Sequence, residues 1–254
     1  APYFQGLDVP PQAAEKFWNC AERAGDFRKE DYGLLPVQVD SWAGLIFVNL
    51  AAEARPLADW LGDLPKRYRR YPLDQLELAR RTTYSINANW KLIAENFMEY
   101  YHLPWVHPEL CNISGFANHH RCQGPGMYTG MCTSPLSIDP QTVRLDLPNF
   151  PGLNSTESES VYFILLFPNL ALWIFPNHLV TLLFQPTSAG ITMEHMDLLI
   201  HPNARAEPEC DKQLDYILEF WDMVNRQDIE IVETVQQGIS TRAYPGGRMC
   251  YEFE

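Results

Sequence analysis

Residues 89–110, NWKLIAENFMEYYHLPWVHPEL, join a helix signal to an unusual group of ionisable side chains. Asn89 is a good N-cap residue, and the residues after it favour a helix that Pro104 should end. On such a helix, three polar residues recur at i, i+4 and i+7 and share one face with the apolar Leu92: Glu95, Glu99 and His102. Acids beside a histidine on a partly apolar face predict a functional site in this stretch.

The composition is typical of a globular protein with an acidic balance. The chain has 254 residues, 46% of them hydrophobic, which is enough to fill a substantial core. Its net charge of −13 argues against a nucleic-acid or anionic-membrane surface, although it is also typical of ordinary solubility. No apolar run reaches the ~18 residues that span a bilayer, and the start, APYFQGLD, does not resemble a signal peptide. We therefore expect a cytoplasmic protein that binds neither nucleic acid nor membrane.

Hydrophobic periodicity predicts an α+β fold. Four short apolar segments separated by Pro, Asn and Gly indicate an antiparallel meander, at residues 161–167, 170–175, 179–185 and 191–200. Before the opening stretch we expect a hairpin within 34–50, a short helix at 57–70 and a strand at 76–89. Residues 111–160 have no sustained period, so we expect a mobile loop or lid there. The class is an antiparallel sheet packed by a few helices, the longest of them C-terminal.

That C-terminal helix, roughly residues 209–237, has an acid in its apolar stripe. The stripe consists of Leu214, Ile217, Leu218, Trp221, Val224, Val232 and Val235. Asp228 falls on the same face, between Val224 and Val232. A lone buried carboxylate is costly, so it must be protonated, paired with a cation or bound to a metal. Alternatively, Asp228 lies by chance near an exposed part of the stripe.

Two histidines in the opening stretch suggest a partner for this acid. His102 and His107 are spaced H-x4-H, and because Pro104 interrupts the helix, the second imidazole can turn back toward the first. Two imidazoles and one carboxylate from a distant element make the facial triad that binds Fe(II) and leaves positions open for oxygen and substrate. A zinc hydrolase site is the competing interpretation, but the pattern H-E-x-x-H is absent. A third interpretation is that the two histidines and the acid are unrelated polar residues.

The combined motif resembles the catalytic domain of Rieske-type non-haem iron oxygenases. The resemblance rests on NWK…EN…E-x-Y-H-x4-H together with a downstream D-x4-E-x2-Q-x-G, and it extends from about Leu35 to Glu254. It implies a helix-grip fold of the Bet v1/START type, with His102, His107 and Asp228 as the iron ligands. It also implies that Glu99 bridges to a Rieske cluster on a neighbouring subunit and carries electrons between the two metal centres. A homotrimer and a reductase partner follow from the same resemblance.

The chain departs from the family in its cysteines. A Rieske [2Fe-2S] cluster needs C-x-H and C-x2-H pairs, and none of the six cysteines has either spacing. We therefore expect residues 1–50 to be a remnant that follows a missing Rieske domain, and residues 51–254 to be the catalytic mononuclear iron domain. The missing initiator Met favours a fragment of a longer polypeptide over a natural variant. Such a fragment should be inactive without its Rieske domain.

A second departure bears on the substrate. Many family members have Asp where this chain has Glu99, and Glu there resembles the branch that acts on quaternary ammonium compounds such as carnitine and glycine betaine. Oxygenation of an N-methyl group with O2 would release formaldehyde and the demethylated amine. Side chains that we expect near the substrate are Phe97, Tyr101, Trp105, Trp173, Phe175 and His195. Two alternatives remain open: an aromatic-ring-hydroxylating dioxygenase, and a non-enzymatic helix-grip module that only binds a small ligand.

Overall fold

The computed structural model describes residues 16, 25, 28, 31, 33–51, 53–113, 115–136 and 147–248. The chain forms two compact units: Ala1–Asp40 with Ile46–Arg55, and Ser41–Leu45 with Pro56–Glu254. Much of the predicted remnant at residues 1–50, and the cysteines at positions 20 and 250, lie outside the described residues. The expected division after residue 50 stays a prediction.

The predicted hairpin is formed by β1 (Gln38–Trp42) and β2 (Leu45–Asn49). Its turn residues, Ala43 and Gly44, both have positive φ angles, of 55° and 76°. Positive φ at both central residues is the signature of the tight turn that matches the twist of paired strands.

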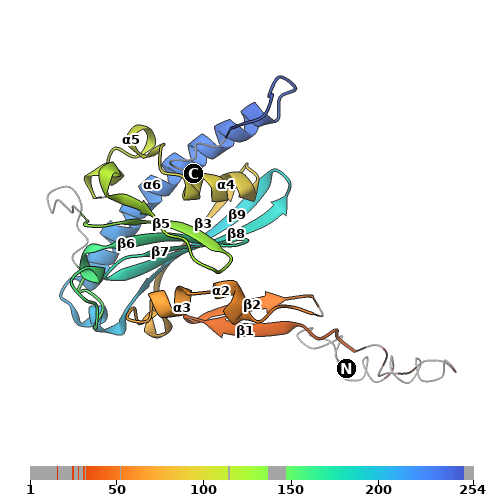
Figure 1. The fold of residues 1–254 in the computed structure, drawn as a ribbon, viewed down its shortest axis with the longest axis horizontal. Helices are drawn as coiled ribbons and strands as arrows, with labels where there is room; N and C mark the ends of the chain where they lie inside the picture. Colours follow the sequence, from red (N-terminus) through yellow and green to blue (C-terminus); the bar gives the residue numbers. More distant parts are fainter. Residues whose placement is uncertain are drawn as a thin grey trace. The chain divides into compact units, whose positions relative to one another are not determined.

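A single antiparallel sheet of seven strands forms the body of the larger unit, in the order β3-β9-β8-β7-β6-β5-β4 (Figure 1). The predicted meander is confirmed, and the predicted strand before the opening stretch is β3, which pairs with β9 at one end of the sheet. The strands are β3 (Glu77–Ile86), β4 (His119–Arg121), β5 (Tyr128–Thr133), β6 (Val161–Leu166), β7 (Leu170–Ile174), β8 (His178–Ser188) and β9 (Ile191–Ile200).

Two of these strands fall where we expected only a loop. Within 111–160, β4 pairs with β5 and β5 pairs with β6, so the prediction of a lid over the whole of this range was wrong. The sequence of β5, YTGMCT, lacks a clear apolar alternation. Its extended conformation is stabilised by pairing with β6, because its local propensity for a strand is weak. Gly130 is required there, because a Cβ at this position would lie 2.4 Å from the carbonyl oxygen of Phe163.

The helix expected at 57–70 is divided in two. α2 (Leu57–Leu61) ends at Gly62, whose φ of 58° is left-handed, and α3 (Leu64–Arg67) follows. A Cβ at Gly62 would lie 2.3 Å from the backbone nitrogen of Gly126, so both the conformation and the space require glycine. Short 3-10 turns complete the connections, at Leu73–Gln75, Leu110–Asn112, Phe116–Asn118, Glu157–Glu159 and Pro202–Ala206.

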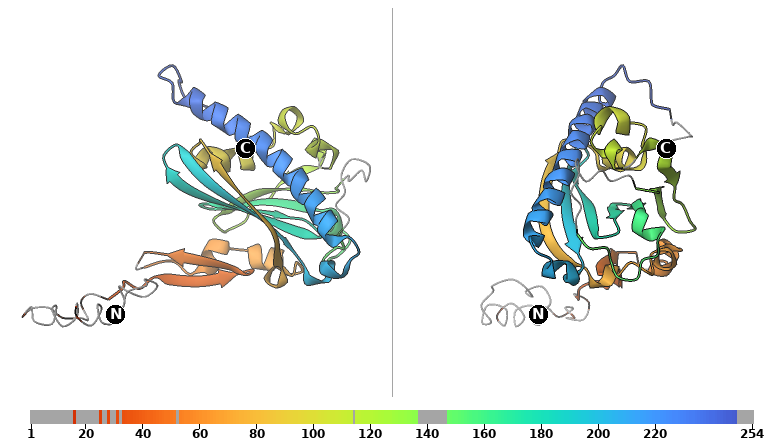
Figure 2. Two further views of the ribbon diagram at one scale, coloured as in Figure 1. Left: turned by 180° about the vertical axis from the view of Figure 1, so that it is seen from behind. Right: turned by 90° about the vertical axis from the view of Figure 1, so that its left-hand side faces the viewer.

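The long helix α6 (Cys210–Ile239) runs diagonally across the sheet (Figure 2). Its buried residues include most of the predicted apolar stripe: Leu214, Ile217, Trp221, Val224 and Val232. Val235 is an exception, with 42% of its surface exposed, because it lies near the end of the helix. The sheet and α6 share one hydrophobic core, which confirms the α+β class with a long C-terminal helix. Among the described residues, no helix has the length and apolar composition needed to cross a bilayer.

Candidate metal centre

Hydrogen bonds connect the start of helix α4 (Trp90–Met98) to α6. The side chain of Asn89 caps α4 by accepting a hydrogen bond from the backbone nitrogen of Lys91 at 3.0 Å. The backbone nitrogen of Asn89 in turn donates to the Oε1 atom of Gln236 at 2.8 Å. One turn earlier on α6, Glu233 accepts from the backbone and the side chain of Asn87, at 2.8 and 3.0 Å. Glu233 and Gln236 of the D-x4-E-x2-Q-x-G motif therefore hold α4 in place.

Helix α4 ends earlier than predicted. Its last residue is Met98, and Glu99 already has an extended backbone, so the expected helix through His102 was wrong. Two consecutive tyrosines are weak helix formers. Pro104 does not end a helix but lies in the first turn of a new one, α5 (Leu103–Val106), where its missing N–H is harmless.

The chain turn between the two helices brings Glu99 back onto His102. The carboxylate of Glu99 accepts a hydrogen bond from Nδ1 of His102 and another from the backbone nitrogen of the same residue at 3.3 Å. Glu99 is only 5% exposed. The predicted contact between these two side chains is thus present, although a turn rather than a continuous helix produces it. Glu95, which we expected on the same face, is exposed on α4.

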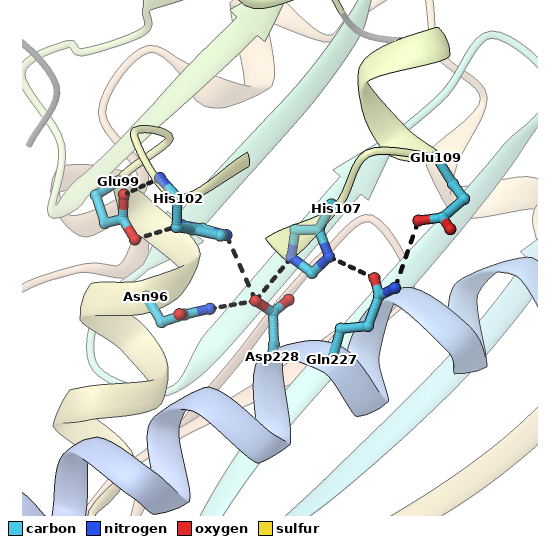
Figure 3. Close-up of polar contacts among 7 residues, drawn as sticks. All are labelled: Asn96, Glu99, His102, His107, Glu109, Gln227 and Asp228. Atoms are coloured by element: carbon cyan, nitrogen blue, oxygen red, sulfur yellow. Dashed lines mark hydrogen bonds and ion pairs between the residues drawn. The ribbon is translucent and has the colours of Figure 1, made fainter. Parts of the chain in front are cut away.

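His102, His107 and Asp228 lie together between α5 and α6 (Figure 3). Nε2 of His107 is 2.9 Å from Oδ1 of Asp228, and Nε2 of His102 is 3.4 Å from the same oxygen. One potential ligand atom from each residue lies within 4.8 Å of the corresponding atoms of the other two. His107 is almost fully buried, whereas 23% of the Asp228 side chain remains accessible. The three residues can therefore hold a metal ion from one side.

The hydrogen bonds behind the two imidazoles favour a cation at this point. Nδ1 of His102 contacts Glu99, and Nδ1 of His107 is 2.7 Å from Oε1 of Gln227. If both Nδ1 atoms donate to these acceptors, both Nε2 atoms present lone pairs toward Asp228, which is itself an acceptor. Three lone-pair donors that face one another repel unless a cation or protons lie between them. A divalent metal ion fits this donor set.

Without a metal, protons neutralise the cluster. Burial opposes the charged form of His102, but its hydrogen bonds to Asp228 and Glu99 outweigh burial and raise its pKa to about 9. Burial likewise opposes ionisation of Asp228, yet hydrogen bonds from His102 and His107 lower its pKa to about 2. A metal ion that binds here must therefore displace protons, so its affinity should fall as the pH is lowered.

Asn96 also belongs to this cluster and was not predicted from the sequence. Its Nδ2 donates to Oδ1 of Asp228 at 2.7 Å across the interface between α4 and α6. This bond fixes the carboxylate and leaves its second oxygen available. Asn is disfavoured within a helix, so its presence inside α4 is a signal in the sequence that points to a role for Asn96.

A cavity of about 50 Å³ adjoins the three donors. Its apolar walls come from the helices α4, α5 and α6, from the turn after α5 and from the sheet. They include Phe97, Leu103, Leu110, Met131, Phe163, Trp173, Trp221 and Val224. Phe97 and Trp173, both expected near the substrate, stack with an interplanar angle of 8°. Trp221 donates its indole N–H to Nε2 of His178 at 3.1 Å, and burial lowers the pKa of His178 to about 3, so that imidazole is a neutral acceptor.

The structure places the other expected pocket residues elsewhere. Trp105 is 85% exposed and Tyr101 is 46% exposed. Phe175 is buried behind the cavity, stacked on His178. His195 lies on the exposed side of the sheet, where it contacts Thr83 and Gln185. These four residues do not line the cavity, whereas His119, which we did not expect there, does.

Another buried acid contacts α6 about one turn before Asp228. Glu194 on β9 is 1% exposed and accepts a hydrogen bond from Nδ2 of Asn225 at 2.6 Å. Burial raises its pKa from 4.5 to about 7. Between these two values the folded chain keeps a proton that the unfolded chain has lost, so the contribution of Glu194 to stability is greatest below pH 4.5 and is lost as the pH rises through about 7.

We expect this single group to reduce the free energy of unfolding by roughly 3 kcal/mol between pH 4.5 and 7.5. Urea unfolding of the metal-free chain across this range would measure the loss. Other groups titrate in the same range, so the informative quantity is the difference between the wild type and Glu194→Gln, whose amide cannot ionise. Parallel pH profiles for the two proteins would show that Glu194 is ionised in the fold.

The family of the chain follows from its sequence match. The model of the ring hydroxylating alpha subunit (catalytic domain) family matches residues 73–254, which contain all three donors and both helices that carry them. The chain belongs to this family. The recognition made from the motif is therefore confirmed.

Several relatives of this ring-hydroxylating family member are oxygenases of quaternary ammonium compounds. The glycine betaine monooxygenase oxygenase subunit of Pseudomonas aeruginosa is 28% identical over 91% of this chain and 61% of its own length. The carnitine monooxygenase oxygenase subunit of Escherichia coli K12 is 26% identical over 90% of this chain and 58% of its own length. The chain thus spans about three fifths of the curated relatives that it matches.

Solved structures of the family have the same fold. The quaternary ammonium Rieske monooxygenase CntA, in complex with L-carnitine, matches 89% of this chain and 57% of its own with a TM-score of 0.68 and 23% identity. Naphthalene 1,2-dioxygenase from Rhodococcus sp. matches 93% and 60% with a TM-score of 0.63 and 21% identity. At these identities the likeness establishes the fold, and the fold alone serves both substrate classes.

Proposed function

We propose that this chain is the catalytic part of an oxygenase that uses O2 at a mononuclear non-haem Fe(II) to oxygenate an N-methyl group of a quaternary ammonium compound. The observation that carries the proposal is the convergence of His102, His107 and Asp228 on one wall of an aromatic cavity. Two imidazoles and one carboxylate on one face are typical of oxygenases that bind Fe(II).

In this proposal the three residues are the iron ligands. Iron supplies a redox-active centre for the reduction of O2. The chain holds both imidazoles with Nε2 toward the metal, through Glu99 and Gln227, and it fixes Asp228 through Asn96. The apolar walls of the cavity exclude water from the reacting methyl group.

The aromatic lining of the cavity favours a cationic group. At about 50 Å³ the cavity is a third of the roughly 150 Å³ that accommodates benzene in an engineered protein cavity, so it must widen for a quaternary ammonium compound and for a fused aromatic ring alike. Four aromatic side chains line it, and the attraction of an aromatic ring for a methylammonium is worth up to ~2 kcal/mol when desolvated: Phe97, Phe163, Trp173 and Trp221. The names of the glycine betaine and carnitine relatives support the same class.

The reaction needs electrons that this chain does not provide. One O2, two electrons and two protons convert N–CH3 to N–CH2OH and water, and the N–CH2OH product then breaks its C–N bond to give the amine and formaldehyde. We assign the electrons to a reductase and to a [2Fe-2S] Rieske cluster in the parent polypeptide, arranged as a homotrimer. A CntA structure is described in terms of inter-subunit electron transfer, which supports a route between subunits.

The test uses the complete oxygenase with its reductase and a substrate panel. We expect formaldehyde in step with O2 consumption from one or more of glycine betaine, carnitine and choline. The matched control is 3,3-dimethylbutan-1-ol, in which carbon replaces the quaternary nitrogen of choline, and it should give much lower turnover because it lacks the charge. Hydroxylated rings from naphthalene or indole, without formaldehyde, would instead assign a ring dioxygenase. A protein that retains an apolar ligand and binds no iron would be a binding module.

A further inference from the structure

We infer that Gln227 and Glu109 are positioning residues that select the tautomer of His107 in which Nε2 is free to bind a metal. The inference rests on the proposed metal site and adds two residues to it. Gln227 and Asp228 are neighbours on α6, and they contact opposite nitrogens of the same imidazole (Figure 3). His107 is 1% exposed, so its ring has no access to solvent for either nitrogen.

Two hydrogen-bond patterns satisfy a neutral His107. In the first, Nδ1–H donates to Oε1 of Gln227 over 2.7 Å, and the lone pair of Nε2 faces the metal position. In the second, Nε2–H donates to Oδ1 of Asp228 over 2.9 Å, and the Gln227 amide is turned over so that its NH2 group donates to Nδ1. The first pattern is complete once a cation lies between Nε2 and Asp228, whereas the second is complete without a cation and leaves no lone pair for a metal.

Glu109 disfavours the second pattern. Its Oε2 atom lies 3.4 Å from Nε2 of Gln227, on the side of the amide away from His107. A carboxylate only accepts hydrogen bonds, so it requires the NH2 group of Gln227 on its own side. Turning the amide over would place Oε1 of Gln227 against the carboxylate of Glu109. The hydrogen bond from Nε2 would then be lost, and the two oxygens would repel each other. This favours the orientation in which Oε1 faces His107 and accepts the proton carried by Nδ1.

His102 needs no such arrangement. Its partner at Nδ1 is the carboxylate of Glu99, which has no donor group and accepts in any orientation. The two imidazoles are thus oriented by different means: His102 by an acid directly, and His107 by an amide whose orientation an acid determines. We therefore expect metal binding by His107, but not by His102, to depend on a residue that does not contact the imidazole itself. That residue is Glu109, which acts through Gln227.

The experiment measures metal affinity of the metal-free chain, with Co(II) as an air-stable probe and Fe(II) under anaerobic conditions. Gln227→Met keeps the volume but removes the acceptor, and we expect a loss of affinity of about 10–100-fold. Gln227→Glu, made together with Glu109→Gln so that two carboxylates do not face each other, provides an acceptor that has no donor group and should bind within a few-fold of the wild type. Glu109→Gln can itself donate or accept, which permits both patterns, and it should lose affinity by a few-fold.

The controls are exposed positions on α6. Gln237→Met makes the same substitution away from the site, and Glu230→Gln removes one charge near Asp228 at a side chain that makes no hydrogen bond to Gln227, so both should bind as the wild type does. Unchanged affinity in Gln227→Met would overturn the inference, as would equal losses in Gln227→Met and in the double variant with Gln227→Glu, which would indicate packing. A wild type that binds neither metal would instead refute the proposed site itself.

Discussion

Replacing Asp228 by alanine is expected to abolish metal binding while the chain remains folded. The carboxylate is the common partner of both imidazoles, and it is the only charge among the three donors that can offset a divalent cation. Its loss should therefore exceed the roughly 10–100-fold decrease that follows when only a partner of a ligand is removed. His102→Ala and His107→Ala should each have an effect of similar size. Metal content after anaerobic reconstitution, together with the far-ultraviolet circular dichroism of each variant, provides the measurement.

His119 supplies the matched control for these variants. It is a buried histidine that lines the same cavity, but its Nδ1 donates to the carbonyl oxygen of Gly115 at 3.1 Å and it is outside the donor cluster. His119→Ala should keep its iron. Full metal content in His102→Ala, His107→Ala or Asp228→Ala would remove that residue from the proposed ligand set, and metal loss in His119→Ala would add a fourth member to it.

The donor set could be predicted because its signals are local and chemically unusual. An acid in the apolar stripe of α6 and two histidines around Pro104 each contradict simple burial, and such contradictions can be read from spacing alone. The helix boundary was missed for the opposite reason. Pro104 is compatible with the end of one helix and with the first turn of the next, and the backbone of Glu99, not the proline, decides between them.

The residues that support the donors could not be predicted in the same way. Gln227 and Asn96 are ordinary polar residues on helices, and their roles arise only when α4, α5 and α6 meet. The pocket shows the same limit. Trp105 lies close to His107 in sequence but points into solvent, whereas Trp221, far away in sequence, lines the cavity because it lies on the buried face of α6. Proximity in sequence was a poor guide to these aromatic positions.

Glu99→Gln is expected to separate electron transfer from metal binding in the complete oxygenase. Glu99 is not one of the three clustered donors, and the amide oxygen of Gln can still accept from Nδ1 of His102. Iron and substrate should therefore bind within a few-fold of the wild type. The amide lacks the charge and the two acceptor oxygens with which a carboxylate can join His102 to a histidine of a Rieske cluster. We expect turnover to fall by roughly 100-fold.

The decisive measurement for Glu99 is a single turnover without reductase. The oxygenase is reduced beforehand, mixed with O2 and substrate, and followed by the visible absorption of the Rieske cluster as it is oxidised. In Glu99→Gln this oxidation should slow in parallel with steady-state turnover, because the route to the mononuclear iron is impaired. Glu95→Gln, at an exposed position on α4 four residues before Glu99, removes the same charge and should leave both rates unchanged. If Glu99→Gln lost its iron, Glu99 would be a ligand and the triad would need reassignment; if it turned over normally, the bridging role would be wrong.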